Sequence, residues 1–423
     1  MEHLMQEDFF SSLQGELLHS ELINKGKDSW NLAVTISHLI LNHNQHTEKH
    51  DWDSILGATL SNSKKSSKRS LTLHLFPSHN NCRKYSKTKI KSEDPEQLQK
   101  IIQSMSYHRK MPEAYESNFR KRFKIIINPN SGRGLARRVW NQVSPLFKVC
   151  EVSVSYTERR NHATEIVTEL NLAEFDGLIV ISGDGLVHEV INALCKREDA
   201  DIARLFPVGI IPAGSANALA QVVCFRSGEG MNVQNAAYIC IKGKPQPYDI
   251  SLVKFESGLE VYSFLCVFWA FIADVDIESE KCRCCGMCRF DLYGFWRVLS
   301  LRRYSGCIKW DDGEYNGPIV YFIACNAPFI GEGMHVAPKS KIHDGLNDLL
   351  FLGNVGRMPL IRVLLRQDAG THVSVPQLQY IKSSKWSLKP DDKRGILSID
   401  GERFDCDNIE VEVLKEYATI IFL

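Results

Sequence analysis

From Phe123 onward the chain alternates short apolar runs with helical patterns, and this alternation limits the possible folds more than any other feature of the sequence. The strand-like runs lie at 124–128, 152–156, 177–181 and 208–211. The helical patterns lie at 133–147, at 162–170, at 184–195 and from Ser215 onward. Strands and helices that alternate in this way form a doubly wound, mostly parallel sheet.

Different patterns lie on the two sides of this α/β segment. Residues before it hold strand-like pieces at 32–40 and 71–76 and a closing helical pattern at 95–106, which predicts a small β-rich module. Past Pro247 strand-like runs dominate, and they favour a mostly antiparallel domain. Those runs lie at 249–255, 261–271, 306–310, 319–326, 348–352 and 409–423.

We therefore expect an α/β plus β protein in three parts. The parts are a β-rich module at 1–118, a doubly wound α/β domain at 119–247 and an antiparallel β domain at 248–423. A chain of 423 residues is long enough for each part to bury a core of its own.

The bulk composition excludes several classes of protein. A formal net charge of +1 gives no basis for bulk binding to nucleic acid. The N-terminus is acidic and lacks the apolar core of a secretory signal, so we expect a cytoplasmic protein. Its 13 cysteines lack the spacing of a disulfide framework, which predicts free thiols. The longest apolar run, Val261–Ala273, is shorter than the ~20 residues that span a bilayer.

Basic residues cluster between and after the strand-like pieces of the N-terminal module. One interpretation is an ordinary solvated loop. The other is attraction of the module to an anionic membrane leaflet, where each basic side chain contributes on the order of 1 kcal/mol. The residues are Lys64, Lys65, Lys68, Arg69, Arg83, Lys84, Lys87, Lys89 and Lys91.

Three strand-to-helix junctions of the α/β segment carry small residues. In a parallel sheet such loops open at the carboxyl ends of the strands, where ligands bind, so we expect all three to line one crevice. Glycine lets a backbone approach a phosphate closely, and the amides at a helix start favour an anion. The loops are Asn128–Gly134 (NPNSGRG), Ser182–Gly185 (SGDG) and Pro212–Asn217 (PAGSAN).

The first of these loops is not one of the two commonest phosphate-binding motifs. It lacks the Gly-Lys-Ser/Thr ending of a P-loop and the spacing of a dinucleotide fingerprint. Glycines at a single strand end are often plain turns, so the argument depends on all three loops together. The sequence therefore predicts a phosphate-binding edge of another kind.

Asp184 lies between two glycines directly after a buried strand. A buried carboxylate without a partner is unfavourable, so this residue needs a role. One role is that of a general base, which accepts the proton of an attacking hydroxyl during phosphoryl transfer. The other is the N-cap of the helix at 184–195. On that helix His188 reads as a structural hydrogen-bonding residue, and Glu189 as a group that reaches nucleotide or a metal.

These loops, in this order, resemble the motifs of sphingosine kinases, which belong to the diacylglycerol-kinase-like superfamily. The resemblance covers about residues 123–423. The segments Thr157–Ala163 (TERRNHA) and Ala273–Asp276 (ADVD) are specific to the sphingosine branch. The matching segments are Asn128–Pro129, Thr157–Ala163, Ser182–Glu189, Pro212–Ala220, Phe271–Lys281, Leu301–Tyr304, Ala337–Pro338, His343–Gly345 and Asp400–Glu402.

The resemblance implies a lipid kinase that uses ATP and Mg²⁺, although the sequence does not show the metal ligands. It implies that Asp184 is the catalytic base and that the loop of Ser182, Gly183, Asp184 and Gly185 contacts the lipid. It also implies that the end of the chain returns to the ATP cleft. The residues implied to surround ATP are Asn128, Pro129, Asn130, Thr157, Glu158, Arg159, Arg160, Asn161, Glu189, Gly214, Ser215, Ala216, Arg283, Arg289, Asp400, Gly401 and Glu402.

Asp276 is implied to hold the polar head of the sphingoid base. A carboxylate there has an independent physical reason, because a sphingoid base carries a primary ammonium and ceramide does not. Asp274 is the alternative, since in a strand both side chains would point to the same face. The apolar run 261–272 is expected either to line a tunnel for the alkyl chain or to be ordinary core.

Two features depart from the family pattern. Ala216 stands where many relatives have glycine, which is tolerated if its φ is below zero. The segment Cys282–Cys288 (CRCCGMC) offers thiolates for zinc. Its spacing is not that of paired Cys-x-x-Cys knuckles, so we favour small, partly buried thiols on a helix.

The resemblance thus implies an enzyme that phosphorylates the primary hydroxyl of sphingosine or a related long-chain base, giving sphingosine 1-phosphate and ADP. The alternatives are a ceramide or diacylglycerol kinase of the same superfamily, and a non-catalytic lipid-binding scaffold. We expect peripheral association with anionic membranes and a pleckstrin-homology-like N-terminal module, as some lipid kinases of this superfamily carry.

Overall fold

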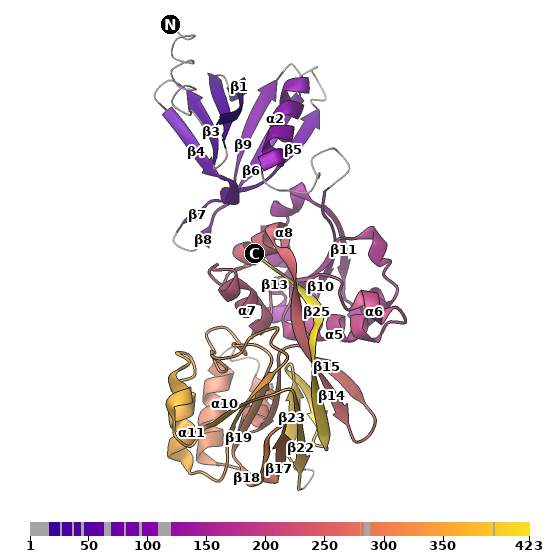
Figure 1. The fold of residues 1–423 in the computed structure, drawn as a ribbon, viewed down its shortest axis with the longest axis vertical. Helices are drawn as coiled ribbons and strands as arrows, with labels where there is room; N and C mark the ends of the chain where they lie inside the picture. The colour runs from indigo at the N-terminus through magenta and orange to yellow at the C-terminus, as the bar shows by residue number, and fades with distance from the viewer. Residues whose placement is uncertain are drawn as a thin grey trace. The chain divides into compact units, whose positions relative to one another are not determined.

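The computed structural model describes residues 17–25, 28–35, 38–43, 46–62, 69–79, 82–92, 95–108, 120–279, 281–282, 288–391 and 394–423. The chain divides into two compact units, which are residues 1–123 with 141–153, and residues 124–140 with 154–423. Figure 1 follows the chain by colour from the first to the second. The C-terminal β segment and most of the α/β segment belong to the second unit, whereas residues 119–123 and 141–153 of the α/β segment belong to the first. The boundary expected at 247 stays a prediction.

The N-terminal module is a seven-stranded sheet with the strand order β4-β3-β2-β1-β9-β6-β5. Its strands are β1 (Leu17–Lys25), β2 (Asp28–Thr35), β3 (His38–His43), β4 (His46–Asp51), β5 (Ile55–Asn62), β6 (Arg69–Leu75) and β9 (Ser86–Ser92). The 3-10 turn η1 (Trp52–Ser54) precedes β5, and the hairpin of β7 (Ser78–His79) and β8 (Cys82–Arg83) follows β6.

Helix α2 (Pro95–His108) closes this module, as expected. Proline suits the first helical position because its missing N–H would have no partner there. Leu98, Ile101 and Met105 recur at helical spacing and are buried in the same core as the strands. The closing helix and the strand-like piece at 71–76 are therefore present, whereas the piece read at 32–40 falls on the end of β2 and the start of β3.

Part of the basic stretch after Leu75 forms strand β9, whereas one interpretation of its sequence was a solvated loop. In β9 the side chains alternate, with Ile90 buried in the core and the lysines on either side of it exposed. This period of two is that of a strand with one face on the core and one face in solvent. The exposed lysines are Lys87, Lys89 and Lys91.

One basic residue of this stretch is not available for docking. Arg83 is buried, and its Nη1 donates to the carbonyl oxygen of Phe76 at 3.0 Å and to that of Asp53 at 3.4 Å. Lys84 is exposed. Lys64, Lys65 and Lys68 lie outside the described residues.

The α/β segment has the four strand and helix pairs that the sequence predicts. Strands β12 and β13 run parallel, with Ser182 opposite Pro212, so their following loops start at the same edge of the sheet. The elements are β10 (Arg122–Ile127), η2 (Ser131–Arg133), α3 (Leu135–Val143), η3 (Leu146–Val149), β11 (Glu151–Tyr156), α4 (His162–Thr168), η4 (Leu172–Glu174), β12 (Gly177–Ser182), α5 (Asp184–Lys196), α6 (Ala200–Ala203), β13 (Val208–Pro212), α7 (Ala218–Arg226) and α8 (Val233–Lys242).

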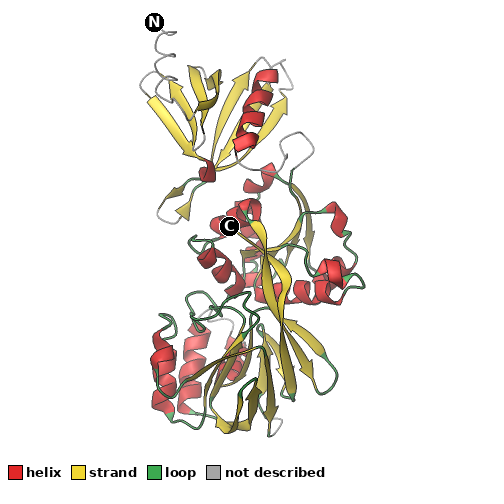
Figure 2. Ribbon diagram, viewed as in Figure 1, coloured by secondary structure: helices red, strands yellow, loops and turns green. Residues whose placement is uncertain are grey.

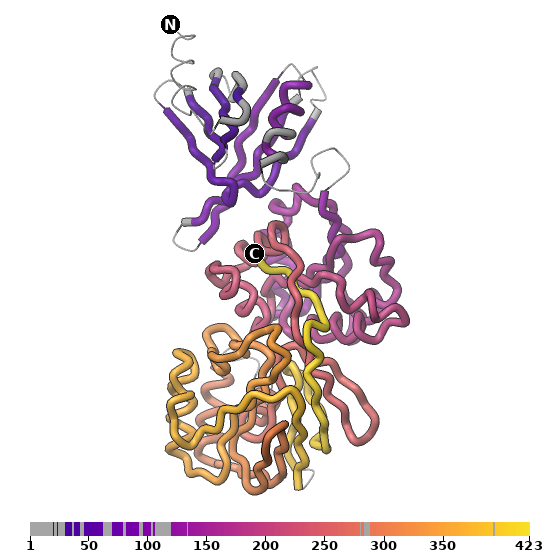
Figure 3. Tube along the Cα trace, in the orientation of Figure 1, coloured from indigo at the N-terminus to yellow at the C-terminus, as the bar shows by residue number. Residues whose placement is uncertain are grey.

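Two long strands continue this sheet into the C-terminal segment. Strand β25 (Ile409–Phe422) pairs parallel with β13 near its end, where Val208 lies opposite Ile420. Along most of its length it pairs antiparallel with β14 (Lys244–Phe255). Figure 3 shows the last part of the chain running beside β14 up to the C-terminus. The end of the chain thus returns to the α/β sheet.

The C-terminal segment packs two sheets face to face. The first is the six-stranded sheet β21-β20-β19-β16-β23-β24, and the second consists of strands that extend the sheet of β25. Large side chains such as Trp269, Phe322 and Trp386 fill the core between them. The further strands are β15 (Glu260–Ser263), β16 (Cys266–Ala270), β17 (Tyr304–Trp310), β18 (Gly313–Ile319), β19 (Tyr321–Cys325), β20 (Asn347–Leu352), β21 (Gln379–Ser383), β22 (Lys385–Pro390), β23 (Ile396–Ile399) and β24 (Glu402–Asp405).

Helices cover the other face of the six-stranded sheet, and the sequence reading did not include them. They are α9 (Phe271–Glu278), α10 (Cys288–Leu299) and α11 (Arg357–Leu364), with the short turn η6 (Thr371–Ser374) after α11. Figure 2 shows these helices beside the strands of the C-terminal segment. Within the described residues, no helix has both the length and the apolar character needed to cross a bilayer.

The helical conformation of α9 overturns one expectation. The run 261–271 was expected to be a strand, and if the strand continued, the side chains of Asp274 and Asp276 would point to the same face. Instead the chain turns at Ala270, whose φ is +59°, and α9 begins at Phe271. Residues two apart on a helix differ in direction by about 200°, since one turn takes 3.6 residues. The two carboxylates therefore point to different sides of α9.

Candidate active site

The three glycine-bearing loops lie together, as their positions after parallel strands predict. A Cβ atom on Gly214 would lie 2.3 Å from the Cα of Gly183, and one on Gly132 would lie 2.4 Å from the carbonyl oxygen of Ala213. Real Cβ atoms do not approach so closely, so glycine is required at both positions. Gly132 also has a φ of +54°, which glycine adopts readily.

Asp184 connects two of these loops through its carboxylate. Oδ2 accepts the backbone N–H of Ala218 at 2.8 Å, and Oδ1 accepts that of Leu219 at 3.1 Å. These are the first two residues of α7, so the carboxylate lies at the positive end of that helix. The helix α5 itself begins at Asp184 and its N-cap is Gly183. The interpretation of Asp184 as the N-cap of its own helix is therefore wrong.

The surroundings of Asp184 oppose its ionisation and also position it. Burial raises the pKa of the Asp184 carboxyl above its usual value, while the two α7 amides act in the opposite direction and the Asp400 carboxylate adds to the rise. A carboxylate has about four acceptor positions, and the amides of Ala218 and Leu219 use two of them. Asp184 thus keeps acceptor capacity for a substrate hydroxyl.

Occupation of the α7 amides changes one expectation about this loop. The first free amides of each helix were expected to favour phosphate. In α7 the amides of Ala218 and Leu219 already bind Asp184. The turn before them is held by Asn217, which has a φ of +50° and whose side chain bonds both the N–H and the C=O of Gly214. Sequence reading placed Asn217 in the loop without a role, although asparagine is enriched at such left-handed positions.

Two acidic residues and one arginine come together beside Gly185. Arg160 Nη2 donates to Glu402 Oε2 at 2.9 Å, and Glu402 Oε1 would lie 2.9 Å from a Cβ on Gly185. Burial raises the pKa of Glu189, while the backbone N–H groups of Asn161 and Ala163 lower it by hydrogen bonding. Within the described part of the chain, Glu189 Oε2 is buried without a hydrogen-bond partner.

These contacts bring together segments that lie far apart in the sequence. Glu189 on α5 holds the turn that starts α4, and Glu402 from the late strand β24 meets the same turn through Arg160. Thr157, at the start of that turn, is buried, and its N–H donates to the carbonyl oxygen of Ile127. Glu158 donates its N–H to His162 Nδ1, and Arg159 pairs with Glu165 at the surface.

The carboxylate of Asp400 is occupied by protein donors. Oδ1 accepts the hydroxyl of Ser263 at 2.7 Å and the N–H groups of Leu265 at 2.9 Å and Cys266 at 3.0 Å. Oδ2 accepts the N–H of Phe264 at 3.2 Å and lies 2.9 Å from His188 Nδ1. The ATP contact implied for Asp400 stays a prediction, and these bonds give the residue a positioning role.

His188 links the Asp400 carboxylate to helix α5, which begins at Asp184. It lies one turn after Asp184 on α5 and contacts Asp400, as the structural reading of this histidine predicts. The next turn bears Asn192, whose side chain exchanges two hydrogen bonds with the backbone of Tyr262, at 2.8 and 3.0 Å. The helix of Asp184 is thereby fixed to the segment that leads into β16.

The first phosphate loop and its neighbours are held by local bonds. Asn128 Oδ1 accepts the N–H of Asn130 at 3.0 Å across Pro129. The carbonyl oxygen of Ala216 accepts the N–H of Glu332 at 3.0 Å, a contact from the C-terminal segment that the sequence did not indicate. Ala216 is not among the residues with positive φ, which meets the condition under which alanine is expected to be tolerated there. Ser215 lies in the loop of Ala216, and Gly401 lies beside Asp400 in the turn between β23 and β24.

Of the two arginines implied to bind phosphate, Arg289 is described and Arg283 lies outside the described residues. Arg289 is 8% exposed, and its guanidinium lies 4.5 Å from the centre of the Phe290 ring. No described residue bonds its Nη1. A buried guanidinium donor without a partner is unfavourable, which is consistent with an anionic ligand at this position.

The two acidic residues of α9 differ in what they contact. Asp274 is 1% exposed, pairs with Arg297 and accepts the hydroxyl of Tyr304 at 2.8 Å. Asp276 is only partly buried and accepts the hydroxyl of Ser398 at 2.7 Å. Asp274 is therefore committed to a buried ion pair, and this favours Asp276 of the two candidates.

The carboxylates of Asp276 and Asp184 both act electrostatically on the thiol of Cys266. Burial raises the pKa of this thiol well above its usual value, and the carboxylates of Asp400, Asp276 and Asp184 add to the rise, after Cys325. Cys266 follows the segment that Asp400 binds. The candidate base and the candidate headgroup acid thus act on the same buried group.

The apolar run before α9 divides between two cores. Trp269 belongs to the core between the two sheets. Four others belong to the core under the helices, and they are Phe264, Leu265, Phe268 and Phe271. Ordinary core is thus the observed state of all five, and the alkyl tunnel stays a prediction. Among described residues, no group of three or more His, Cys, Asp or Glu side chains is arranged to hold a metal.

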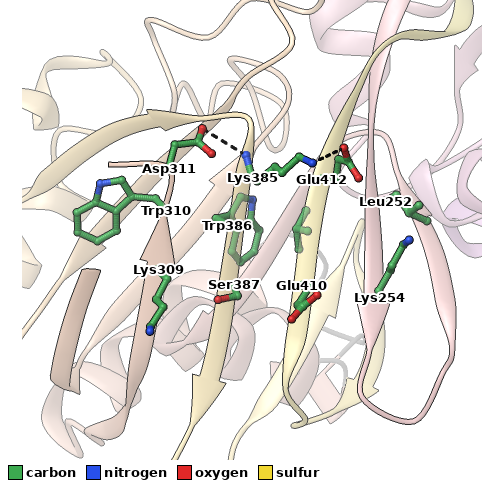
Figure 4. Close-up of a pocket in the computed structure, with 11 residues that line it drawn as sticks. Leu252, Lys254, Lys309, Trp310, Asp311, Lys385, Trp386, Ser387, Glu410 and Glu412 are labelled. Atoms are coloured by element: carbon green, nitrogen blue, oxygen red, sulfur yellow. Dashed lines mark hydrogen bonds and ion pairs between the residues drawn. The ribbon is translucent and has the colours of Figure 1, made fainter. Parts of the chain in front are cut away.

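An open groove lies apart from these loops. It has a volume of about 360 Å³ and runs across β14, β17, β22 and β25. Its floor carries charged residues that pair with each other, including Lys385 with Glu412 at 2.9 Å (Figure 4). The implied ATP and lipid residues do not line it, so this groove is not the candidate active site.

Comparisons with known proteins agree with the geometry. Residues 122–253 match the family model of the diacylglycerol kinase catalytic domain. Residues 274–421 match the model of the YegS C-terminal NAD kinase beta sandwich-like domain. The solved structure of a diacylglycerol kinase from Bacillus anthracis aligns with 73% of this chain and 98% of its own, with a TM-score of 0.52 and 17% identity. At that identity the alignment shows a shared fold alone.

Curated relatives are more similar in sequence. Sphingosine kinase 1 of Arabidopsis thaliana is 30% identical over 331 residues, which cover 67% of this chain and 68% of that protein. Sphingosine kinase 1 of Homo sapiens is 31% identical over 343 residues, covering 70% and 89%. Sphingosine kinase 1 of Caenorhabditis elegans is 35% identical over 379 residues, covering 70% and 80%.

Proposed function

Because this chain belongs to the sphingosine kinase family, we propose that it transfers the γ-phosphate of ATP to the primary hydroxyl of sphingosine or a related sphingoid base, giving sphingosine 1-phosphate and ADP. The observation that carries the proposal is the position of Asp184. Its carboxylate is fixed by the first two amides of α7, at the edge where three glycine-bearing loops meet. That is the edge of a parallel sheet at which ligands bind.

In the proposed mechanism Asp184 accepts the proton of the lipid hydroxyl as its oxygen attacks the γ-phosphorus. A base with a raised pKa takes this proton more readily at neutral pH. Burial supplies the rise, and the α7 amides keep the carboxylate from turning away. Asp400 and His188 act through α5 and hold Asp184 in place, so they are positioning residues.

ATP is proposed to lie against the turn of Thr157–Asn161, the loop of Asn128–Asn130 and the loop of Gly214–Ala216. Arg289 supports the presence of an anionic ligand, because its buried guanidinium has an unbonded nitrogen in the described part of the chain. Mg²⁺ is proposed to accompany the nucleotide. It is commonly held by one or two carboxylates together with substrate phosphates, and Glu189, with its buried and unbonded Oε2, suits that role.

The sphingoid ammonium is proposed to pair with Asp276. This carboxylate is partly buried, and Asp274 is already paired with Arg297. Ceramide and diacylglycerol have no ammonium and gain nothing from a carboxylate at this place. The site therefore favours a sphingoid base over the acceptors of related kinases.

Replacement of Asp276 by Asn is expected to raise the KM for sphingosine by about tenfold or more, since a charge-assisted hydrogen bond contributes about 1.5–3 kcal/mol. The KM for ATP is expected to stay within twofold. Both constants are measured with radiolabelled ATP and sphingosine in detergent micelles. Asp405→Asn, an exposed change on β24, serves as the control. An unchanged KM for sphingosine in the Asp276 variant would refute ammonium recognition by this residue.

Peripheral binding to membranes is supported by an apolar stripe on α10. Its side chains recur at positions i, i+3, i+4 and i+7 and are 51% to 69% exposed. They are Leu292, Phe295, Trp296 and Leu299. Exposed apolar groups of this extent mark interaction surfaces, and exposed Arg302 and Arg303 follow the stripe. We assign this stripe to contact with a bilayer, next to the segment that carries Asp276.

The double change Phe295→Ser and Trp296→Ser is expected to weaken binding to neutral vesicles by about tenfold or more, because burial of each large apolar side chain contributes about 1.5–3 kcal/mol. Turnover in detergent micelles is expected to stay the same. Co-sedimentation with phosphatidylcholine vesicles gives the binding. Ile202→Ser with Leu205→Ser removes two exposed apolar groups from the α6 region as the matched control. Equal losses in both variants would contradict the assignment.

A pleckstrin-homology-like fold is proposed for the N-terminal module. Support comes from its seven-stranded order, β4-β3-β2-β1-β9-β6-β5, and from the single helix α2 after the last strand. A cytoplasmic location with peripheral recruitment to membranes is proposed as well. The described cysteines, from Cys82 to Cys406, are all free thiols, as reducing compartments favour.

A further inference from the structure

The loop between β19 and β20 reaches the candidate nucleotide loop, and the proposed mechanism gives it no role. The backbone N–H of Glu332 donates to the carbonyl oxygen of Ala216 at 3.0 Å. A Cβ atom on Gly331 would lie 3.8 Å from the same oxygen, so the backbone of this turn lies directly against Ala216. We name residues Phe329–His335 the contact loop.

The tip of the contact loop is a tight turn that leaves one N–H to donate outward. The N–H of Met334 donates to the carbonyl oxygen of Gly331 at 3.2 Å, which closes the turn. Gly333 has a φ of +75°, whereas Glu332 is not among the residues with positive φ. A positive φ at the third residue but not at the second is the pattern of a type II turn. In such a turn the N–H of the second residue, here Glu332, has no acceptor inside the turn.

Three aromatic rings attach the contact loop to the last turn of α7. The rings of Phe329 and His335 stack with their centres 4.4 Å apart. The ring of Phe225, on α7, packs edge-on against Phe329 with the centres 5.0 Å apart, and Phe225 is 55% exposed. The contact loop therefore touches α7 and its approach at both ends, at Ala216 before the first residue and at Phe225 in the last turn.

The C-terminal segment holds the contact loop from its other side. His372 is buried, and its Nε2 lies 2.8 Å from the carbonyl oxygen of Val336, directly after the loop. A Cβ atom on Gly370 would lie 2.9 Å from His335 Nδ1, so the backbone at Gly370 packs against that ring. The contact loop is thus a fixed support and not a free end.

We propose that the contact loop positions the nucleotide loop Gly214–Ala216 for ATP, with the Glu332 N–H as the donor that fixes Ala216. The inference rests on the proposed function and adds a positioning residue to it. Asn217 fixes Gly214 from within the nucleotide loop, since its side chain bonds both backbone groups of Gly214. Glu332 fixes the other end from outside. A loop held at both ends is preorganised, so less conformational freedom is lost when ATP binds.

The test replaces Glu332 by Pro in the full chain. Proline suits the second position of a type II turn, so the turn is expected to persist. The change removes the N–H, and the ring carbon in its place pushes the Ala216 carbonyl oxygen away. Binding of ATP with Mg²⁺ is measured by isothermal titration calorimetry without lipid. The Kd is expected to rise about fivefold, within the range that one neutral hydrogen bond contributes.

Turnover separates positioning of the nucleotide from a general loss of structure. The KM for ATP is expected to rise with the Kd, and the KM for sphingosine to stay the same. The kcat at saturating ATP is expected to stay within about twofold, because bound ATP returns the loop to its competent orientation. Glu332→Ala is the matched control, since it removes the exposed side chain and keeps the N–H. It is expected to bind ATP like the unchanged protein.

A second pair of variants tests the ring contact. Phe225→Ala is expected to raise the Kd for ATP about two- to tenfold, the range that an aromatic pair contributes. Phe225→Tyr keeps the ring and is expected to keep the affinity. Because Phe225 is more than half exposed, both variants are expected to fold, and urea unfolding checks this. The pair decides the question if the proline variant does not fold.

Three results would overturn the proposal. They are an unchanged Kd in folded Glu332→Pro, an equal loss of affinity in Glu332→Ala, and equal affinities in Phe225→Ala and Phe225→Tyr. ATP binding by the unchanged protein without transfer to sphingosine would count against the proposed function alone. Absence of ATP binding by the folded, unchanged protein would overturn both.

Discussion

Replacement of Asp184 by Asn is expected to lower kcat by about 10²–10⁴-fold, the range that general-base catalysis contributes. The amide cannot accept the proton of the lipid hydroxyl, although it fills nearly the same space. One α7 amide also loses its acceptor, so we expect a loss of stability of about 1–3 kcal/mol. Turnover is measured with radiolabelled ATP, and the folded fraction by urea unfolding under the same conditions.

The two effects are separable because the protein stays folded at low urea. If Asp184 only held α7 in place, kcat per folded molecule would fall little, and Asp184→Asn would keep full turnover once corrected for the folded fraction. That outcome would contradict the assignment of the base. The change Asp199→Asn, at an exposed ion pair with Arg197, is the matched control and is expected to leave kcat unchanged.

The pH dependence follows from the raised pKa of Asp184. Activity needs the deprotonated carboxylate, so kcat/KM is expected to rise with pH, with its acid limb above the usual aspartate pKa of 3.8. The sign for stability is the opposite. A raised pKa means that the folded state binds the proton more tightly, so the contribution of this group to stability is lost as pH rises through that pKa. Above its pKa the Asp184 carboxylate is therefore available as a base, but it no longer makes this contribution to the stability of the fold.

Replacement of Asp400 by Ala is expected to lower the free energy of unfolding by at least about 3 kcal/mol. The change leaves the hydroxyl of Ser263, three backbone N–H groups and the contact to His188 without their acceptor, and each buried unsatisfied group costs about 1–3 kcal/mol. Turnover is expected to fall with it, because α5 loses the His188 contact, one of its connections to the segment that leads into β16. Urea unfolding and kcat at low urea measure the two losses.

Asp405→Ala, an exposed change on the neighbouring strand β24, is expected to shift stability by less than about 0.5 kcal/mol. A role of Asp400 in ATP binding alone predicts a different outcome. It would raise the KM for ATP in Asp400→Ala while the free energy of unfolding stays the same, and that result would disprove the positioning role.

The sequence predicted the α/β segment well, because its strands and loops follow one another directly. The loops at 128–134, 182–185 and 212–217 each come after a buried strand, and parallel pairing requires them to share an edge. Local periodicity was sufficient there. Asp184 could be identified for the same reason, since a carboxylate between glycines at such an edge is unusual in ordinary core.

The partners of Asp184 and Asp400 could not be predicted in this way. His188 and Asp400 lie 212 positions apart, and their contact depends on how β23 pairs with β16. No local pattern reports such a pairing. No local pattern reports the contact between Asp184 and α7 either, so the α7 amides that bind Asp184 were expected to face phosphate.

The helices of the C-terminal segment were missed because their patterns are atypical. Helix α9 alternates apolar and acidic residues from Ala273 to Glu278 and follows directly from β16, so its sequence resembles a continued strand. Helix α10 exposes its apolar stripe, which reverses the usual rule that apolar faces are buried. One interpretation of the β9 lysines was a solvated loop, because the many charged residues obscure the alternation of buried and exposed side chains that indicates a strand.

A parallel assay of three acceptors tests the central claim most directly. Sphingosine, ceramide and diacylglycerol are presented in the same detergent micelles with radiolabelled ATP, and the labelled lipid products are separated and counted. Transfer to sphingosine at least about a hundredfold faster than to the other two lipids is the expected result. Equal or faster transfer to ceramide or diacylglycerol, or no transfer to sphingosine by folded protein, would contradict the account.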